Sequence, residues 1–173
     1  MAHKPKGFTV VVEDESIFTY DVKATAIWAI KGSKPRILST GSKARTIWFG
    51  ALAEDQTQLF RQYKTADSDA FLDYLNVLTK KYPRMIFFID KASYHKTEAR
   101  VKAYFRRHKD TIKVRWFPSG FPESNALEEC WKQGKKDVLG SRFYPTFQGF
   151  KKATTQYYRT KKFKLDLYKY LCH

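Results

Sequence analysis

The first third of the chain places short apolar runs between polar turns. Each run is rich in β-branched or aromatic residues and is typical of a strand, and glycine, proline and serine separate the runs. The predicted strands are 8–12, 25–30, 45–52 and 58–63. This spacing predicts an antiparallel meander, whose first strand ends in the acidic cluster 13–15.

The pattern then changes to helical spacing. Apolar residues recur at Phe71, Tyr74, Leu75, Leu78 and Tyr82, which predicts an amphipathic helix. Asp67 and Ser68 can cap its start, and Pro83 ends it.

Alternating strands and helices follow. The continuous apolar run 85–89 predicts a buried strand that ends at Asp90. We expect a helix at 101–108, a strand at 112–117, a rigid loop at 118–122, a helix at 127–138 and helical structure from 146 onward. The order indicates an α/β fold, in which a mixed β-sheet is flanked by α-helices, with ligands at the carboxyl ends of parallel strands.

The net charge of the chain indicates the kind of partner that it binds. The 173 residues carry 33 Lys and Arg against 17 Asp and Glu, a net charge of +16. Residues 131–173 hold eleven basic and two acidic residues, a net +9, among aromatic side chains. With 43% hydrophobic residues the chain can fold, so we expect a folded domain that binds a polyanion, nucleic acid first and a membrane surface second.

Several classes of protein are excluded. No apolar run approaches the roughly 20 residues of a membrane-spanning helix, and the N-terminus lacks a signal-peptide pattern. Cys130 and Cys172 are too few for a disulfide framework. We therefore expect an intracellular protein, cytoplasmic or nucleoid-associated if the host is prokaryotic.

Three acids stand where such a fold builds a site. Asp14 ends the first strand, on the face of Val10 and Val12, Asp90 ends the buried strand, and Glu128 lies near a helix start. Converging carboxylates repel one another unless a cation lies between them. Oxygen ligands suit Mg²⁺ or Mn²⁺, and two such ions can support phosphodiester cleavage.

Each acid also has a structural interpretation. Asp14 could belong to a solvated acidic turn, and Asp90 could form an Asx turn. Glu128 could complete a capping box with Asn125. The lysines of the C-terminal quarter could be the solvated face of a helix.

Three segments, in order, resemble a known family. Residues 10–18 read VVVEDESIF, residues 88–97 read FIDKASYHKT and residues 117–131 read FPSGFPESNALEECW. Together they resemble the DDE transposases of the mariner-like superfamily, particularly its bacterial and archaeal insertion-sequence branch. Lys91 and Ala126 depart from the family pattern, and the proline-rich block is degenerate.

The resemblance implies a ribonuclease H-like fold and metal-dependent cleavage of DNA followed by strand transfer in transposition. Asp14, Asp90 and Glu128 would be the catalytic and metal-binding triad for two Mg²⁺ or Mn²⁺ ions, with Asp14 bridging them. His95 falls at the family's histidine, with either a structural role or a substrate contact. We expect 1–173 to form a single catalytic domain with a basic C-terminal helical segment at about 141–173 and no N-terminal helix-turn-helix domain.

The expected partner is DNA, as transposon ends and target, with a homodimer as a candidate assembly and no membrane. The residues expected to contact DNA are Lys91, His95, Lys132, Lys135, Lys136, Lys151, Lys152, Lys161 and Lys162. Two alternatives remain open: a catalytically decayed transposase fragment that only binds DNA, and another ribonuclease H-like nuclease.

Overall fold

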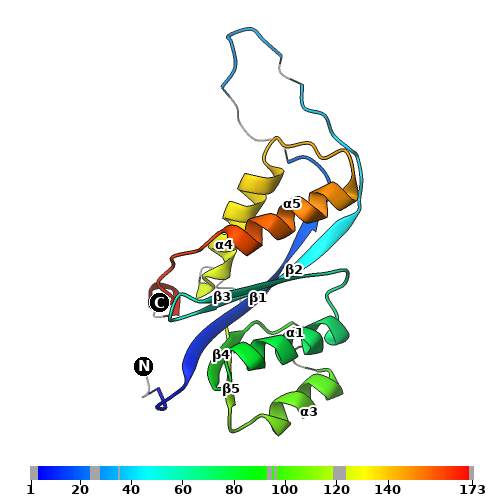
Figure 1. The fold of residues 1–173 in the computed structure, drawn as a ribbon. Helices are drawn as coiled ribbons and strands as arrows, with labels where there is room; N and C mark the ends of the chain where they lie inside the picture. Colours follow the sequence, from blue (N-terminus) through cyan, green and yellow to red (C-terminus); the bar gives the residue numbers. More distant parts are fainter. Residues whose placement is uncertain are drawn as a thin grey trace.

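A computed structural model describes residues 4–23, 28–34, 36–92, 95, 97–118 and 124–171. Its centre is a sheet in the order β3-β2-β1-β4-β5 (Figure 1). The strands are β1 (Thr9–Thr19), β2 (Arg45–Ala53), β3 (Gln58–Tyr63), β4 (Met85–Ile89) and β5 (Ile112–Trp116). Strands β1, β2 and β3 pair antiparallel, whereas β4 is parallel to both β1 and β5. The predicted mixed sheet is confirmed.

Strand β1 is longer than its local sequence predicts. It runs through the acidic cluster to Thr19, paired with β2 over its whole second half. Its pairing with β4 ends earlier, at Val12 opposite Phe88. The prediction that the strand ends at Asp14 is therefore wrong with respect to β2. The nine-residue β2 supplies backbone partners that override the low strand propensity of Glu, Asp and Ser.

The helices largely follow the predicted pattern. They are α1 (Ser68–Lys81), α3 (Ala99–Arg107), α4 (Leu127–Gly134), α5 (Phe147–Thr160) and α6 (Tyr168–Leu171). A π-helical turn, Lys135–Leu139, continues α4, and residues 161–167 between α5 and α6 are irregular. None of the helices in the described ranges is long and apolar enough to cross a bilayer.

The predicted strand at 25–30 is described only in part. Residues 24–27 lie outside the described part of the chain, and residues 28–30 are irregular. Trp28 and Ile30 are exposed, so this end of the run is not buried in the sheet. Most of the predicted loop at 118–122 also lies outside the described residues.

Two apolar cores cover the two faces of the sheet (Figure 1). On one face, helices α1 and α3 pack over Val11, Phe49 and Phe87. On the other face, α4 and α5 pack over Val12 and Trp48. Because neighbouring residues of a strand point to opposite faces, Val11 and Val12 contribute to different cores, and the same alternation continues into the acidic cluster.

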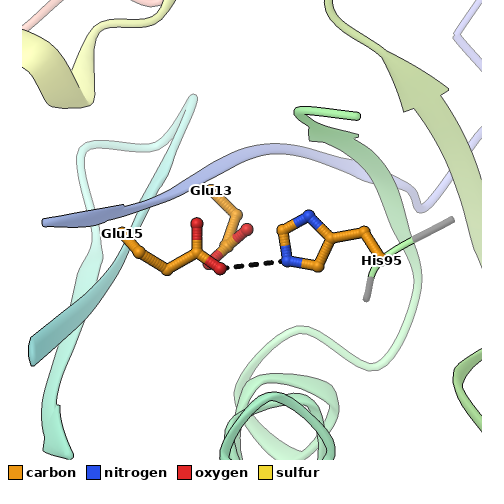
Figure 2. A group of neighbouring side chains, drawn as sticks. All are labelled: Glu13, Glu15 and His95. Carbon is orange, nitrogen blue, oxygen red and sulfur yellow. Dashed lines mark ion pairs between the residues drawn. The ribbon is translucent and has the colours of Figure 1, made fainter. Parts of the chain in front are cut away.

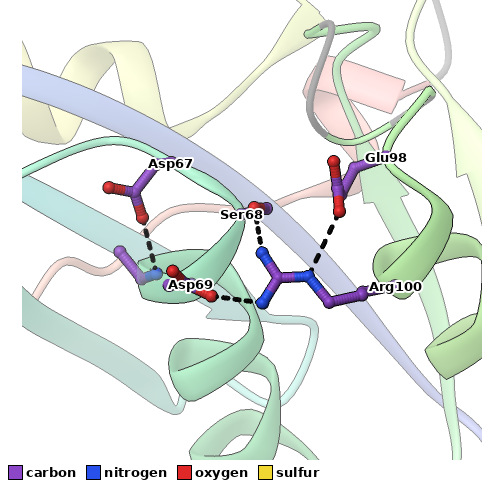
Figure 3. Close-up of polar contacts among 6 residues, drawn as sticks. Asp67, Ser68, Asp69, Glu98 and Arg100 are labelled. Atoms are coloured by element: carbon purple, nitrogen blue, oxygen red, sulfur yellow. Dashed lines mark hydrogen bonds and ion pairs between the residues drawn. The ribbon is translucent and has the colours of Figure 1, made fainter.

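Polar contacts fix the start of α1 beside α3 (Figure 3). The carboxylate of Asp67 caps α1 by accepting a hydrogen bond of 2.9 Å from the amide of Ala70. The Arg100 guanidinium of α3 donates to Asp69 at 2.6 Å and to Ser68 at 2.9 Å, and it pairs with Glu98 at 3.2 Å. These exposed ion pairs contribute little energy singly, but they join the first turns of α1 and α3.

Candidate active site

The pairing of β1 with β4 places two of the predicted acids at one edge. Val12 of β1 lies opposite Phe88 of β4. Asp14 and Asp90 each come two residues later in the sequence. Asp14 has Gly50 of β2 as its other neighbour. Since alternate residues share a face, Asp14 continues the face of Val12, at the carboxyl end of a parallel strand pair, which is the usual ligand site of such sheets.

Two hydrogen bonds tie helix α4 to β1 and so place Glu128. The indole Nε1 of Trp131 donates to Oδ2 of Asp14 at 2.8 Å. The side-chain amide of Asn125 donates to the backbone carbonyl of Glu13 at 3.3 Å, while its oxygen accepts from the amide of Leu127 at 3.1 Å. Asn125 thus forms an Asx turn just before α4, whose N-cap, Ala126, has no side-chain cap bond. No hydrogen bond among the described residues completes a capping box between Asn125 and Glu128.

Glu128 itself is exposed at the start of α4. Its charge is close enough to raise the pKa of Asp14. The structure thus brings the three predicted acids close enough for their charges to interact. Asp14 and Asp90 have carboxylate oxygens within 4.8 Å of each other, and Glu128 lies on the neighbouring helix α4.

The electrostatics of Asp14 show that anionic charge is crowded here. Burial and then the neighbouring Glu15 raise the pKa of Asp14 to about 7, against the lowering effect of the Trp131 hydrogen bond; Glu128 and Asp90 raise it further. Oxygens of Asp14, Glu15 and Asp90 all lie within 4.8 Å of one another. A divalent cation would relieve this repulsion, and the all-oxygen donor set fits Mg²⁺ or Mn²⁺.

Asp90 has a different environment. A hydrogen bond from His95 lowers its pKa against the effect of burial, with help from the amide of Ala92. Oδ1 of Asp90 lies 2.8 Å from Nδ1 of His95 and 2.9 Å from the amide nitrogen of Ala92. The contact with Ala92 confirms the Asx-turn interpretation of Asp90, and it leaves the carboxylate at the site.

His95 is buried between carboxylates, with 1% of its surface exposed. Its Nε2 lies 3.0 Å from Oε1 of Glu15, and its ring is tilted by 44° against that of Phe71, with 4.1 Å between centroids. Burial lowers the pKa of His95, but the bonds to Asp90 and Glu15 outweigh it and raise the pKa to about 9. These contacts favour the structural role of His95, and its contact with DNA stays a prediction.

Glu13 and Glu15 are site residues that the sequence reasoning left out. They flank Asp14 on β1, so both side chains leave the opposite face of the strand, on the side of the α1 core. Glu13 is fully buried. The alternation of side chains along the strand could have identified Glu13. Glu13 comes two residues after Val11 and therefore points to the same face, toward the core beneath α1.

A cleft of about 530 Å³ adjoins Glu128. It is lined by Lys23, Lys132, Lys135 and Tyr170, together with residues of α4. Burial lowers the pKa of Lys135, and its ammonium lies 5.6 Å from the ring centre of Phe18. Two of the expected DNA-contacting lysines therefore stand beside the acids.

The other expected lysines lie further along the chain. Lys151 and Lys152 line a second cleft of about 410 Å³ over α5. Lys161 lies 3.9 Å from the carboxylate of Asp137. Lys91, Lys136 and Lys162 are exposed. These positions form no single cluster, so they describe a basic surface rather than one binding pocket.

Comparison with solved structures finds the same fold. The Mos1 transposase paired-end complex with left transposon end superposes with a TM-score of 0.67 at 15% identity, covering 98% of this chain and 52% of that one. A pre-cleavage Mos1 transpososome gives 0.68 at 14% identity, covering 96% and 52%. A simian T-cell lymphotropic virus intasome, solved with PP2A regulatory subunit B56 gamma, gives 0.55 at 11% identity, covering 88% and 49%.

The chain thus spans about half the length of the solved structures that it matches, and it has their ribonuclease H-like fold. Among curated proteins, none matches this sequence. The family model of the DDE superfamily endonucleases matches residues 9–151. The chain belongs to the DDE superfamily endonuclease family.

Proposed function

We propose that this chain is the catalytic domain of a DDE transposase, which cleaves DNA strands and transfers the freed 3′-hydroxyl into target DNA. The observation that carries the proposal is the convergence of Asp14 and Asp90 at the end of the β1–β4 pair, with Glu128 on a helix tied to Asp14 through Trp131. Family membership supports the same assignment. We propose that residues 1–173 form one domain, with a basic segment at about 141–173.

Asp14, Asp90 and Glu128 are proposed to be the residues that would hold two divalent ions. The solved Mos1 paired-end complexes include one with Mn and one with Mg, and the oxygen donors here fit both ions. When bound, such ions activate a water and stabilise the leaving oxygen of a phosphodiester. The protein's own part is to fix the carboxylates: Trp131 orients Asp14, and His95 orients Asp90.

Duplex DNA is the proposed substrate, as transposon ends and target. The exposed Glu128 and the lysines of its cleft lie on the face of α4, so a phosphate placed over Glu128 would meet Lys132 and Lys135. A homodimer that holds two ends is proposed as the working assembly, acting intracellularly and on nucleoid DNA if the host is prokaryotic.

The test is a set of isosteric variants assayed for nicking of duplex DNA with Mg²⁺ or Mn²⁺, and for joining of a DNA with an exposed 3′-hydroxyl. Asp14→Asn, Asp90→Asn and Glu128→Gln should each abolish both reactions while the circular dichroism spectrum is kept. Glu129→Gln and Asp110→Asn are the matched controls and should remain active, since Glu129 bonds Gln133 instead and Asp110 is exposed.

Full activity in all three triad variants would overturn the proposal. Wild-type chain that binds DNA but neither cleaves it nor takes up Mn²⁺ in a calorimetric titration would instead identify a decayed, DNA-binding fragment. Cleavage restricted to RNA–DNA hybrids or junctions would identify a different ribonuclease H-like nuclease.

A further inference from the structure

A second group of possible ligands shares Glu15 with the oxygens of Asp14 and Asp90 and extends to the face of β1 opposite Asp14. Glu13 and Glu15 project side by side from β1, and His95 faces them from the segment after β4 (Figure 2). One ligand atom from each of the three lies within 4.8 Å of the others. Nε2 of His95 lies 3.0 Å from Oε1 of Glu15.

Glu13 is the anomaly in this cluster. Its side chain is 0% exposed, and neither carboxyl oxygen has a hydrogen-bond partner in the described part of the chain. Burying an unsatisfied carboxyl is costly whether it is charged or neutral. Figure 2 shows this carboxyl beside that of Glu15 and directed toward the His95 ring. A cation held by the three side chains together would give the carboxyl oxygens of Glu13 a partner.

The orientation of His95 fits a metal ligand. Its Nδ1 lies 2.8 Å from Oδ1 of Asp90, and a carboxylate accepts, so Nδ1 carries the hydrogen. In the neutral ring the lone pair then belongs to Nε2, which faces Glu15. A histidine that binds a metal through one nitrogen and donates the other N–H to a carboxylate is the usual arrangement in protein metal sites.

We propose that Glu13, Glu15 and His95 bind one divalent transition-metal ion, of which Zn²⁺ is the best-suited, at a position beside the ions proposed for the triad and with Glu15 common to both groups of ligands. Because the pKa of His95 is raised to about 9, binding of the ion would displace a proton from its ring. The charges of the two ionised carboxylates would then balance the charge of one divalent ion. Imidazole suits Zn²⁺, whereas Mg²⁺ prefers oxygen ligands alone. Ligand atoms around a tetrahedral zinc stand about 3.4 Å apart, which the cluster reaches with small side-chain movements.

The surroundings favour a positioning role over a catalytic one. Phe71 and Tyr74 of α1 cover the cluster as part of the apolar core. Besides Glu15, the carboxylates of Asp14 and Asp90 are close enough to act on Glu13, and Glu13 acts on Tyr74. An ion here would join β1 to the segment after β4 and would fix, through His95, the carboxylate of Asp90. It would leave the Asp14 face open to DNA.

The proposal is tested by zinc retention in the presence of excess Mg²⁺, which occupies oxygen-only sites. The whole chain is dialysed against Zn²⁺ with millimolar-scale Mg²⁺, and bound zinc is counted by mass spectrometry of the metal. We expect one zinc per chain, with one imidazole in its X-ray absorption spectrum. Glu13→Gln and His95→Gln should weaken zinc binding by at least about tenfold. Glu98→Gln, an exposed glutamate paired with Arg100, is the matched control and should keep wild-type affinity.

A second measurement separates a lost ligand from a lost fold. Without metal, Glu13→Gln should melt at or above the wild-type temperature, because it removes a buried carboxyl without a partner; with Zn²⁺ only the wild type should gain stability. If Glu13→Gln does not fold, Glu15→Gln, whose side chain is partly accessible, replaces it. Equal zinc retention in wild type and Glu13→Gln would overturn the site, as would zinc that is lost in Asp14→Asn but kept in Glu13→Gln.

Discussion

The indole of Trp131 donates a 2.8 Å hydrogen bond to the Asp14 carboxylate, across 117 positions of sequence. This bond joins the helix that carries Glu128 to the strand that carries Asp14. It also lowers the pKa of Asp14, which burial otherwise raises. One contact therefore sets both the position and the ionisation of the central proposed ligand.

Trp131→Phe is expected to reduce DNA cleavage by roughly 10- to 100-fold, because a hydrogen bond to a charged group contributes about 1.5–3 kcal/mol. Trp48→Phe is the matched control. Trp48 is also buried in the α4 core, but its indole nitrogen has no hydrogen-bond partner in the described part of the chain. Single-turnover nicking rates should thus fall in the first variant and hold in the second. Equal loss in both would mean that packing, rather than the bond to Asp14, sets the rate.

Gly50→Ala should disturb the same contact from the neighbouring strand. A methyl group at Gly50, which pairs with Asp14, would lie 2.6 Å from the Trp131 ring and 2.8 Å from Phe60. Overpacking of this kind costs about 1–3 kcal/mol, and it pushes the indole off the carboxylate. Urea unfolding should show the loss of stability. In the double variant Gly50→Ala/Trp131→Phe the smaller ring should recover part of it; strictly additive losses would show that the two residues are not coupled.

The contacts of Glu54 join residues near both ends of the described chain to the sheet, and we expect them to weaken at low pH. Its Oε1 accepts from the Lys4 ammonium at 2.6 Å and from the Val10 amide at 3.0 Å, and its other oxygen accepts from the Tyr168 hydroxyl. Burial raises the pKa of Glu54, but these bonds from Lys4, Tyr168 and Val10 bring it below the usual value of 4.5.

A carboxyl whose folded pKa is depressed stabilises the fold above its unfolded pKa and loses that contribution as the pH falls through the folded value. Glu54→Gln should therefore lower the free energy of unfolding at pH 7, by about 1 kcal/mol for the lost hydrogen bonds, and the difference from wild type should shrink below pH 4.5. Urea titrations at several pH values measure this. A difference that stays constant down to pH 3 would contradict the assignment, and Glu98→Gln, which is exposed, should show little effect.

The sequence was sufficient for a mixed sheet flanked by helices, because short apolar runs and helical spacing can be recognised locally. The order of the strands was not predicted, since it depends on pairing between distant segments. The helix from Ser68 to Lys81 and the strand from Met85 to Ile89 match their predicted positions. The extension of β1 through Glu13–Thr19 was not predictable, since it depends on pairing with β2 rather than on local propensity. Nor was the bond between Trp131 and Asp14, because no local pattern specifies which indole meets which carboxylate after folding.

Lys135 is expected to contact a phosphate beside Glu128. It is half-buried in the cleft that Glu128 lines, and both Glu128 and Asp14 are close enough to act on its pKa. Lys135→Gln should reduce the salt dependence of duplex DNA binding by about 0.9 in the slope of log K against log salt, the value of one lost phosphate contact. Lys80→Gln is the control, because Lys80 is exposed at the end of α1 on the opposite face of the sheet. Fluorescence anisotropy between low and moderate salt gives both slopes. If the two variants lower the slope equally, then DNA senses only the overall positive charge of the domain, and Lys135 has no particular contact with it.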